Sequence, residues 1–469
     1  MKQPNIVFIL IDDMGWRDIS CYGSTFYETP NIDRLFKEGM HFTDAYASCP
    51  VCSPTRASIM SGKYPAHIGL TNYIDRGGMH PSRGKLIDAP YIDHLPDTEQ
   101  SLAHSLRENG YRTWHVGKWH CGGSPYLPED HGFDVNIGGC HWGAPGPGGY
   151  ISPWKIDALK DVDVPEGTFL DDWLTDRAVS LIQKKENRPF FLNMWYYLVH
   201  TPVMAKEDLI RKYEDKRLSM GLDKQVEEEE GERFPCEHKR DKRIVRRRVQ
   251  SHPVYAAMIE ILDTNIGKLI DAVEAAGERE NTIFIFTSDN GGLSTAEGSP
   301  TCNAPLIEGK GWMYEGGVRE PLIISWPGVV PPGSVSNTPV TSPDFYPTLL
   351  QAAGLPLQPD QHTDGVSLLD HVKGGEPPER DALFWHYPHY GNQGGTPGSS
   401  VRMGDYKLIE FFEDGRLELY NLRKDISEEH ERSDEEPEKT EELHSRLIAW
   451  RENVNAVIPE PNPEWNELE

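Results

Sequence analysis

Three largely apolar segments with the pattern of buried β-strands constrain the fold of this 469-residue chain more than any other feature. They cover residues 5–11, 189–199 and 281–288. Successive side chains of a strand point to opposite faces of a sheet, so a strand that is apolar throughout must be covered on both faces. Strands of this kind are typical of a parallel sheet with helices on either side. We therefore predict an α/β fold.

Helix and strand patterns fill the chain between these segments. Amphipathic patterns predict helices near residues 30–39, 98–110, 170–185 and 255–274, and further strands are expected at 111–116 and 319–326. A strongly charged insertion at 204–252 is expected to form a solvated surface helix or a mobile segment.

The last part of the chain has a different pattern. Short strand patterns at 382–387, 400–402 and 406–419, with Asp414-Gly415 as a hairpin turn, precede an acidic helical segment at 435–453. We therefore predict a large mostly parallel α/β domain at 1–376 and a smaller α+β subdomain at 377–469, in which an antiparallel sheet is followed by a terminal helix.

The chain is acidic, with a formal net charge of −27. No basic stripe dominates it, which argues against nucleic acid as a partner. An anionic ligand would need a locally positive pocket, and Arg56, Lys118 and Lys310 are candidates for it. No apolar run approaches the roughly 18 residues of a membrane span, and no secretory apolar region follows Met1. We expect no membrane partner and a cytoplasmic location, or a periplasmic or secreted one if a signal peptide was removed; the oligomeric state stays open.

Polar side chains follow each of the three apolar strands. Asp12-Asp13 come after the first, His200 after the second, and Asp289-Asn290 after the third. Ligands of open α/β sheets bind beyond the carboxyl ends of the strands. The carboxylate and amide oxygens match Ca²⁺ or Mg²⁺ rather than zinc. An Asp-Asp pair can also form an Asx turn, so that alternative stays open.

A cysteine precedes a predicted helix at Cys52. Ser53 is suited to the N-cap, Pro54 to the first helical position and Gly62 to the left-handed end. Cys52 would then lie at the anion-attracting N-terminus, with Arg56 on the same face. The alternatives are an inert buried cysteine, or a redox pair or half zinc site with Cys49, although no second pair completes a zinc site. The seven scattered cysteines favour a reducing compartment.

The segment Cys52-Ser-Pro-Thr-Arg56, with its continuation Ala-Ser-Ile-Met-Ser-Gly-Lys-Tyr-Pro65, resembles the modification site of the formylglycine-dependent type I sulfatases. The resemblance extends from Asn5 to Gly317 and returns at 419–422. It implies the alkaline phosphatase-like fold, and a separate formylglycine-generating enzyme that oxidises Cys52 to an aldehyde, which hydrates to a gem-diol. Because Asp289-Asn290 replaces the Asp-His pair of the two-zinc relatives, it implies one Ca²⁺, with Mg²⁺ as an alternative. The implied metal ligands are Asp12, Asp13, Cys52, Asp289 and Asn290.

The resemblance further implies hydrolysis of a sulfate ester of a carbohydrate. The catalytic residues it implies are Cys52, Arg56, Lys118, His120, His200 and Lys310. One hydroxyl of the hydrate would attack sulfur while the cations neutralise the sulfate. His200 with Lys310 would protonate the leaving sugar oxygen, and His120 would take the proton of the second hydroxyl to release sulfate.

Substrate choice is expected to depend on aromatic and hydrogen-bonding residues, and on the C-terminal subdomain closing the pocket. The chain resembles carbohydrate sulfatases that act on sulfated galactose or N-acetylgalactosamine, although the same residues are also typical of packing between domains. The residues concerned are His141, Trp142, His386, His389 and Arg402.

Three other functions stay open. The first is a phosphonate or phosphodiester hydrolase of the same fold. The second, if Cys52 is unmodified, is a calcium-dependent binder of sulfated glycans. The third is a hydrolase with Cys52 as a thiolate nucleophile. Cys49 could also pair oxidatively with an unmodified Cys52.

Overall fold

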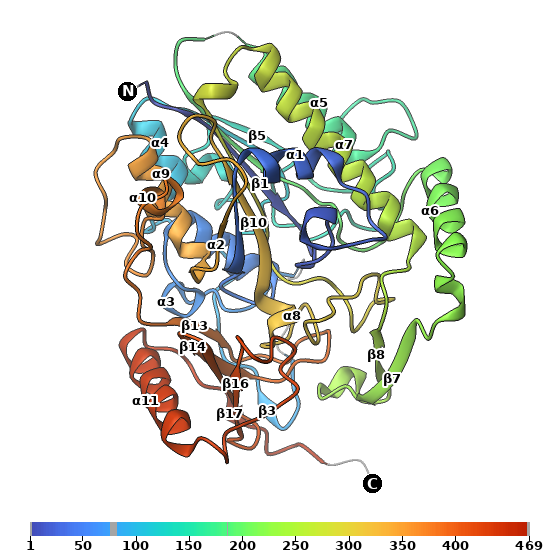
Figure 1. Ribbon diagram of the computed structural model, residues 1–469, viewed down its shortest axis with the longest axis vertical. Coiled ribbons are helices and arrows are strands. Elements are labelled where there is room, and N and C mark those ends of the chain that lie inside the picture. The colour runs from blue at the N-terminus through green and yellow to red at the C-terminus, as the bar shows by residue number, and fades with distance from the viewer. Residues whose placement is uncertain (1, 76–81, 185, 467–469) are drawn as a thin grey trace.

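A large central sheet organises the protein, which we describe from a computed structural model covering residues 2–75, 82–184 and 186–466 (Figure 1). The 9-stranded sheet has the order β11-β2-β10-β9-β1-β6-β4-β5, and β12 also pairs with β2. Among the strands described for this sheet, β10 alone runs antiparallel to its neighbours. The predicted mostly parallel α/β fold is confirmed. The strands are β1 (Asn5–Ile11), β2 (Met40–Tyr46), β4 (Arg112–Gly117), β5 (Val135–Ile137), β6 (Phe190–Trp195), β9 (Thr282–Ser288), β10 (Arg319–Ser325), β11 (Ser334–Ser336) and β12 (Val340–Thr341).

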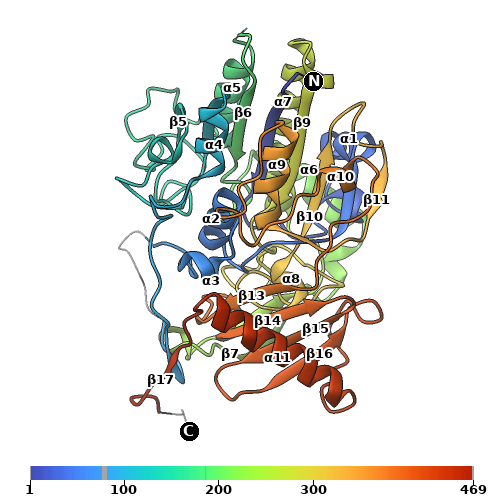
Figure 2. The ribbon, with the colours of Figure 1, turned by 90° about the vertical axis from the view of Figure 1, so that its left-hand side faces the viewer.

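The central strand β1 is buried on both faces, as its apolar sequence predicts. Val7, Ile9 and Ile11 enter one hydrophobic cluster, and the alternate residues of the strand enter a second cluster on the other face. Helices cover both faces (Figures 1 and 2). The first cluster includes residues of α1 (Pro30–Glu38), α5 (Leu170–Ile182) and α7 (Pro253–Ala275). The second includes residues of α2 (Cys52–Ser61), α4 (Leu102–Glu108), α9 (Phe345–Ala352) and α10 (Leu369–Val372).

A second, antiparallel sheet lies at one end of the molecule, near α3 (Pro65–Ile68) and α8 (Glu315–Val318) (Figure 2). The terminal helix α11 (Pro437–Asn453) packs on it, and Trp450 stacks on Phe384 with ring centroids 4.7 Å apart. Both the predicted antiparallel sheet and the predicted terminal helix are therefore present. The strands are β13 (Leu383–Tyr387), β14 (Gly398–Met403), β15 (Tyr406–Phe411) and β16 (Leu417–Asn421), and a separate pair joins β3 (Leu86–Ile87) to β17 (Glu460–Pro461).

The charged insertion contains a helix, which was one of the two structures expected for it. It also contains a hairpin that the sequence pattern did not predict. The helix is α6 (Glu207–Ser219), and the hairpin joins β7 (Glu228–Arg233) to β8 (Arg243–Arg247). Ion pairs cross this hairpin, as between Arg247 and Glu228, so its run of charges forms a paired ladder. The sequence pattern predicted solvated charges here, because the oppositely charged partners of these residues lie on the other strand of the hairpin, in another part of the insertion.

The start of α2 differs from the prediction. Cys52 is its first residue after Val51, and Ser53 does not cap the helix. The Ser53 hydroxyl instead accepts a hydrogen bond from the backbone N–H of Ile74, at 3.1 Å. The helix ends at Gly62 with a φ of 73°, as predicted. None of the described helices combines the length and the apolar character that a membrane span requires.

Candidate active site

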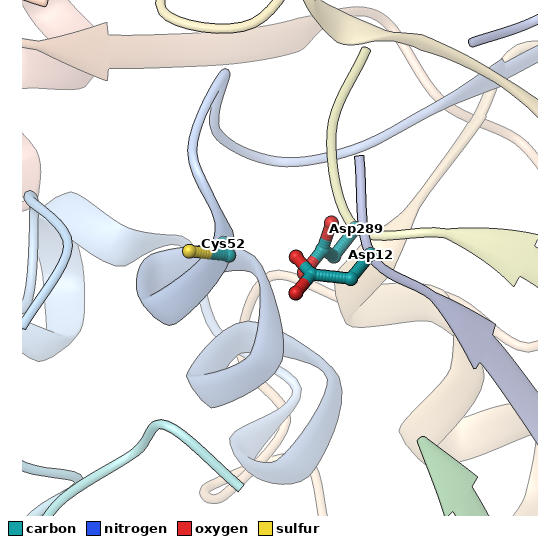
Figure 3. Close-up of side chains that lie close together, drawn as sticks. All are labelled: Asp12, Cys52 and Asp289. Atoms are coloured by element: carbon teal, nitrogen blue, oxygen red, sulfur yellow. The ribbon is translucent and has the colours of Figure 1, made fainter. Parts of the chain in front are cut away.

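The ends of four neighbouring strands bring the predicted catalytic and metal-binding residues together. β1, β9, β4 and β6 are parallel neighbours, and Asp12, Asp289, Lys118 and His200 follow them at the same edge of the sheet. The carboxylates of Asp12 and Asp289 point toward the first turn of α2, which carries Cys52 (Figure 3). Cys52 Sγ and one carboxylate oxygen of each Asp lie within 4.8 Å of one another, and all three residues are buried.

Two buried cations hold these carboxylates in place. Lys118 Nζ lies 2.7 Å from an oxygen of Asp12. The Arg56 guanidinium lies 2.7 Å from Asp289 and also donates to the backbone carbonyl of Lys118, at 2.8 Å. Arg56 in addition lies over the ring of Trp195, 5.1 Å from its centroid. Both cations are therefore fixed beside the carboxylates before any ligand binds.

A lysine and a histidine form a second pair at the site. Lys310 Nζ lies 2.8 Å from Asp13 and 3.1 Å from His200 Nε2. His200 Nδ1 lies 2.7 Å from the carbonyl of Thr201, so Nδ1 carries the hydrogen and Nε2 presents a lone pair to Lys310. Burial and the charge of Lys310 lower the pKa of His200 to about 4. Burial lowers the pKa of Lys310, but the charge of Asp13 outweighs it and the net shift is upward. At neutral pH the proton therefore resides on Lys310.

His120 is arranged as a proton acceptor for residue 52. Its Nε2 lies 2.6 Å from the carbonyl of Ile74 and must donate, so Nδ1 presents a lone pair to Cys52 Sγ, at 3.3 Å. Burial and Lys118 lower the pKa of His120 well below its usual value, which keeps the ring neutral. Burial also raises the pKa of the Cys52 thiol, against the opposing effect of Lys118. A thiolate nucleophile is therefore disfavoured.

The oxygen donors at the strand ends fit a hard divalent cation. The side-chain oxygen of Asn290 is buried and has no hydrogen-bond partner, while its amide nitrogen lies 2.9 Å from Asp13. Burial raises the pKa of Asp289 to about 6, although Arg56 opposes the shift. Burial likewise raises the pKa of Asp12. A site in which carboxylates are crowded and an amide oxygen lacks a donor suits a cation with oxygen ligands.

A cavity of about 240 Å³ opens beside Cys52, and its lining includes several residues that the sequence pattern did not single out. The predicted residues at the cavity are Cys52, His120, His200 and Lys310. The others come from loops far apart in the sequence, where no periodicity or motif marks them. The additional residues are Tyr73, Ile74, Asp75, Gly143, Ala144, Glu297, Asn392 and Gln393.

Most of the residues predicted to bind substrate lie elsewhere. His386 contacts the Ser399 hydroxyl at 2.7 Å and the carbonyl of Val457 at 3.0 Å. Arg402 is buried and lies 2.7 Å from Asp44. Neither residue is part of the cavity lining. The packing alternative accounts for both, because their polar groups connect the C-terminal sheet to its surroundings.

The remaining three predicted residues have different positions. His389 is buried and contacts Thr71 at 2.8 Å, away from the described lining. The Trp142 indole packs in the main core and donates to Asp157 at 3.2 Å. His141 lines a second, neighbouring hollow, which shares Ile74 and Asp75 with the Cys52 cavity. Of the five residues predicted to bind substrate, His141 is therefore the one whose surroundings adjoin the Cys52 cavity.

Comparison with known proteins identifies the family. The sequence profile described as Sulfatase matches residues 4–355. The chain belongs to the sulfatase family. A second profile, described as N-sulphoglucosamine sulphohydrolase, C-terminal, matches residues 308–453 of this sulfatase. The profile of the C-terminal region thus spans the antiparallel sheet and α11.

Several curated sulfatases are similar over most of their length. A sulfatase of Formosa agariphila is 32% identical, covering 97% of this chain and 90% of the relative. The N-acetylgalactosamine-6-sulfatase of Canis lupus familiaris is 31% identical, covering 87% of this chain and 71% of the relative. Human arylsulfatase A is 30% identical, covering 88% and 76%.

The fold also matches solved structures. The crystal structure of Ps i-CgsB superposes with a TM-score of 0.76 at 28% identity, covering 99% of this chain and 95% of that one. The same protein has been solved in complex with k-i-k-neocarrahexaose, with a TM-score of 0.75. The large sheet with its small C-terminal sheet is therefore a sulfatase architecture, and this protein is a sulfatase.

Proposed function

We propose that this sulfatase removes a sulfate group from a sulfated carbohydrate, such as sulfated galactose or N-acetylgalactosamine, with formylglycine at position 52 and one bound Ca²⁺. The names of its relatives support a sugar substrate, since one acts on N-acetylgalactosamine 6-sulfate by name and another binds a neocarrahexaose. The observation that carries the proposal is the position of Cys52. Its side chain contacts His120, lies within 4.8 Å of a carboxylate oxygen of Asp12 and of Asp289, and lines the same cavity as Lys310.

We expect residue 52 to act as the nucleophile once it is modified. Hydrated formylglycine would supply one hydroxyl to attack sulfur and a second to release the bound sulfate. A formylglycine-generating enzyme is the partner that this requires. His120 Nδ1 lies 3.3 Å from Sγ of Cys52 and directs its lone pair at that side chain. It can therefore accept a proton from a hydroxyl of the modified residue. The carbonyl of Ile74 fixes the ring in this tautomer.

Fixed positive charge surrounds the place where the sulfate would bind. Asp12, Asp13, Asp289 and Asn290 would hold the Ca²⁺, which supplies Lewis-acid charge to a sulfate oxygen. Arg56 and Lys118 orient the carboxylates and add their own charge, and both are held by contacts that precede substrate binding. Charges preorganised in a water-poor site stabilise a transition state more than mobile surface charges do.

Lys310 and His200 are suited to protonating the leaving sugar oxygen. Lys310 keeps its proton because of Asp13, and the proton lies on a hydrogen bond to His200 Nε2. Both side chains line the cavity. This pair can therefore deliver a proton to the sugar oxygen as the bond to sulfur breaks.

The test is release of inorganic sulfate by protein produced together with a formylglycine-generating enzyme. Monosulfated galactose and N-acetylgalactosamine isomers are the substrates, with a phosphonate ester and a phosphodiester as competitors. We expect sulfate release that Cys52→Ala abolishes and that Cys49→Ala retains, because the Cys49 thiol lies near the Thr71 carbonyl and not at the cavity. Faster turnover of the phosphonate would identify the alternative hydrolase. Calcium-dependent glycan binding with no turnover of any ester would identify the binder.

A further inference from the structure

Charge is distributed unevenly over the cavity beside Cys52. Its buried part holds Lys310 and His120, and His200 is half-buried beside them. Its more accessible part holds the carboxylates of Asp75 and Glu297, of which Glu297 is exposed. Among the lining residues that the structure describes, Lys310 is the only lysine or arginine. The part of a ligand that lies near Cys52 thus meets the positive charge of Lys310, and its remaining part meets the negative charge of Asp75 and Glu297.

The carboxylate of Glu297 is held from two sides. One oxygen accepts a hydrogen bond from the Thr201 hydroxyl at 3.1 Å, and the other accepts one from the Gln393 amide at 3.1 Å. Thr201 follows His200, and Gln393 belongs to the loop between β13 and β14 of the C-terminal sheet. Glu297 therefore connects the catalytic edge of the large sheet to the C-terminal region, at the cavity itself.

The charge of Glu297 acts on the catalytic pair. Glu297 accepts a hydrogen bond from Thr201, the residue that follows His200, and it lines the same cavity as His200 and Lys310. Its charge therefore acts on an anion bound beside this pair.

We infer that Glu297 determines specificity by accepting hydrogen bonds from the hydroxyls of a neutral sugar ring and rejecting a second anionic group on that ring. The preferred substrate unit then carries one sulfate and no carboxylate. This inference rests on the proposed function, because it describes the substrate of the same site.

Hydrogen bonding and electrostatics both favour this substrate class. Each carboxylate oxygen has two acceptor positions, so Glu297 can accept from sugar hydroxyls while it keeps Thr201 and Gln393. Gln393 is itself held in place, because its backbone carbonyl accepts a hydrogen bond from the Trp312 indole at 3.0 Å. At an effective dielectric constant of roughly 20, like charges several ångströms apart repel enough to change affinity tenfold or more.

The experiment compares Glu297→Gln with the unchanged sulfatase, both carrying formylglycine. The substrates are N-acetylgalactosamine 4-sulfate, 6-sulfate and 4,6-disulfate, and the measured quantity is kcat/KM for sulfate release. We expect the unchanged protein to prefer its monosulfated substrate over the disulfate by about tenfold or more. Glu297→Gln should reduce this preference at least several-fold, mainly by raising kcat/KM for the disulfate. Added salt should reduce the preference of the unchanged protein and have less effect on the variant.

The matched control is Glu452→Gln, which makes the same change of charge on the exposed face of α11. It should leave the ratio of kcat/KM values unchanged. Thermal unfolding of all three proteins shows that they are folded, and Glu297 is exposed, so its substitution should have little effect on stability.

Each result has one meaning. A preference that Glu297→Gln does not alter overturns the inference, and so does an unchanged protein that prefers the disulfate. If the unchanged protein acts on galactose sulfates alone, the same ratio is measured with galactose 4-sulfate, 6-sulfate and 4,6-disulfate. If it releases sulfate from neither series, the proposed function itself fails. The two failures are distinguishable, because the first occurs in an active enzyme.

Discussion

Two buried clusters of charge in this protein contain the same kinds of side chain in different surroundings. The catalytic cluster, named for the role proposed for its residues, consists of Arg56, Lys118, Lys310, Asp12, Asp13 and Asp289. The junction cluster, which joins the region of α8 and β10 to the C-terminal sheet, consists of Arg319, Arg402, Lys407, Asp44, Glu315 and Glu428. Each combines three basic residues with three acidic ones, so the inventory of charges does not distinguish them.

Their surroundings do distinguish them. In the junction cluster Lys407 lies 2.9 Å from Glu315 and 3.0 Å from Glu428, and the described residues of this cluster do not line the Cys52 cavity. Burial raises the pKa of Glu315, but Lys407 and Arg319 outweigh it and bring the pKa to about 2. The catalytic cluster instead reaches a cavity, and the pKa of Asp289 is raised to about 6. The ionised Glu315 carboxylate is paired with basic residues in the junction, whereas the catalytic cluster combines crowded carboxylates with the unpartnered side-chain oxygen of Asn290, which suits a further cation.

The largest expected effect on stability is that of Glu315→Gln in the junction cluster. The substitution leaves Lys407 and Arg319 buried without their carboxylate, which is expected to destabilise the fold by about 3–5 kcal/mol. Chemical denaturation in the presence of a chelator measures it, with Glu452→Gln as the control. An effect no larger than that of the control would show that the junction pairs are not needed for stability.

Substitution in the catalytic cluster should act mainly on activity. Asp289→Asn keeps an acceptor for Arg56 and relieves repulsion with Asp12, so we expect a smaller loss of stability than for Glu315→Gln. Sulfate release should fall by about 10²–10³-fold, as for the loss of one preorganised electrostatic group. Steady-state kinetics and denaturation of the same preparation test both parts. Full activity in this variant would show that the Asp289 carboxylate is not needed for sulfate release.

A cation should stabilise only one of the two clusters. Ca²⁺ at about one hundred times its dissociation constant is expected to stabilise the folded sulfatase by about 2.7 kcal/mol. The gain should be lost in Asp289→Asn and retained in Glu315→Gln. Calorimetry with and without Ca²⁺ measures it, with Mg²⁺ as the alternative ion. An equal gain in all three proteins would place the ion elsewhere.

The smallest effect at any single pH unit is on the pH dependence of stability, through Glu428. Burial raises the pKa of Glu428 to about 7, although Lys407 opposes the shift. The folded protein then holds a proton that the unfolded chain has released, so this contribution is full below pH 4.5 and is lost as the pH rises through about 7. Glu315 acts oppositely, because its contribution is lost only as the pH falls through about 2. The free energy of unfolding should therefore fall less steeply with rising pH in Glu428→Gln than in the unchanged protein, by up to about 1.4 kcal/mol per pH unit between pH 5 and 7. Parallel profiles for the variant and the unchanged protein would contradict this assignment.

The sequence predicts those parts of the fold that depend on local pattern. The apolar run at 5–11 coincides with β1, because a strand buried on both faces is apolar throughout. The residues that follow the strands also meet as expected, since parallel strands carry them to one edge. Strand β2, in which buried and half-buried residues alternate over the first four positions, was not predicted.

Features that depend on distant partners could not be read from the sequence. Ser53 has the pattern of a helix cap, yet its hydroxyl bonds to Ile74, 21 residues away. The aromatic and basic residues of the C-terminal sheet suggested sugar binding, but Arg402 pairs with Asp44. Glu297 and Gln393, which do line the cavity, lie on loops whose meeting no local pattern encodes.

The most direct test of the account is mass spectrometry of residue 52 in protein from its own host. The tryptic peptide of residues 38–56 contains both Cys49 and Cys52, so one spectrum compares the two cysteines. We expect residue 52 to have lost its sulfur and to carry an aldehyde, while Cys49 remains a thiol that can be alkylated. Two alkylated thiols in this peptide, from a preparation that releases sulfate, would contradict the central claim.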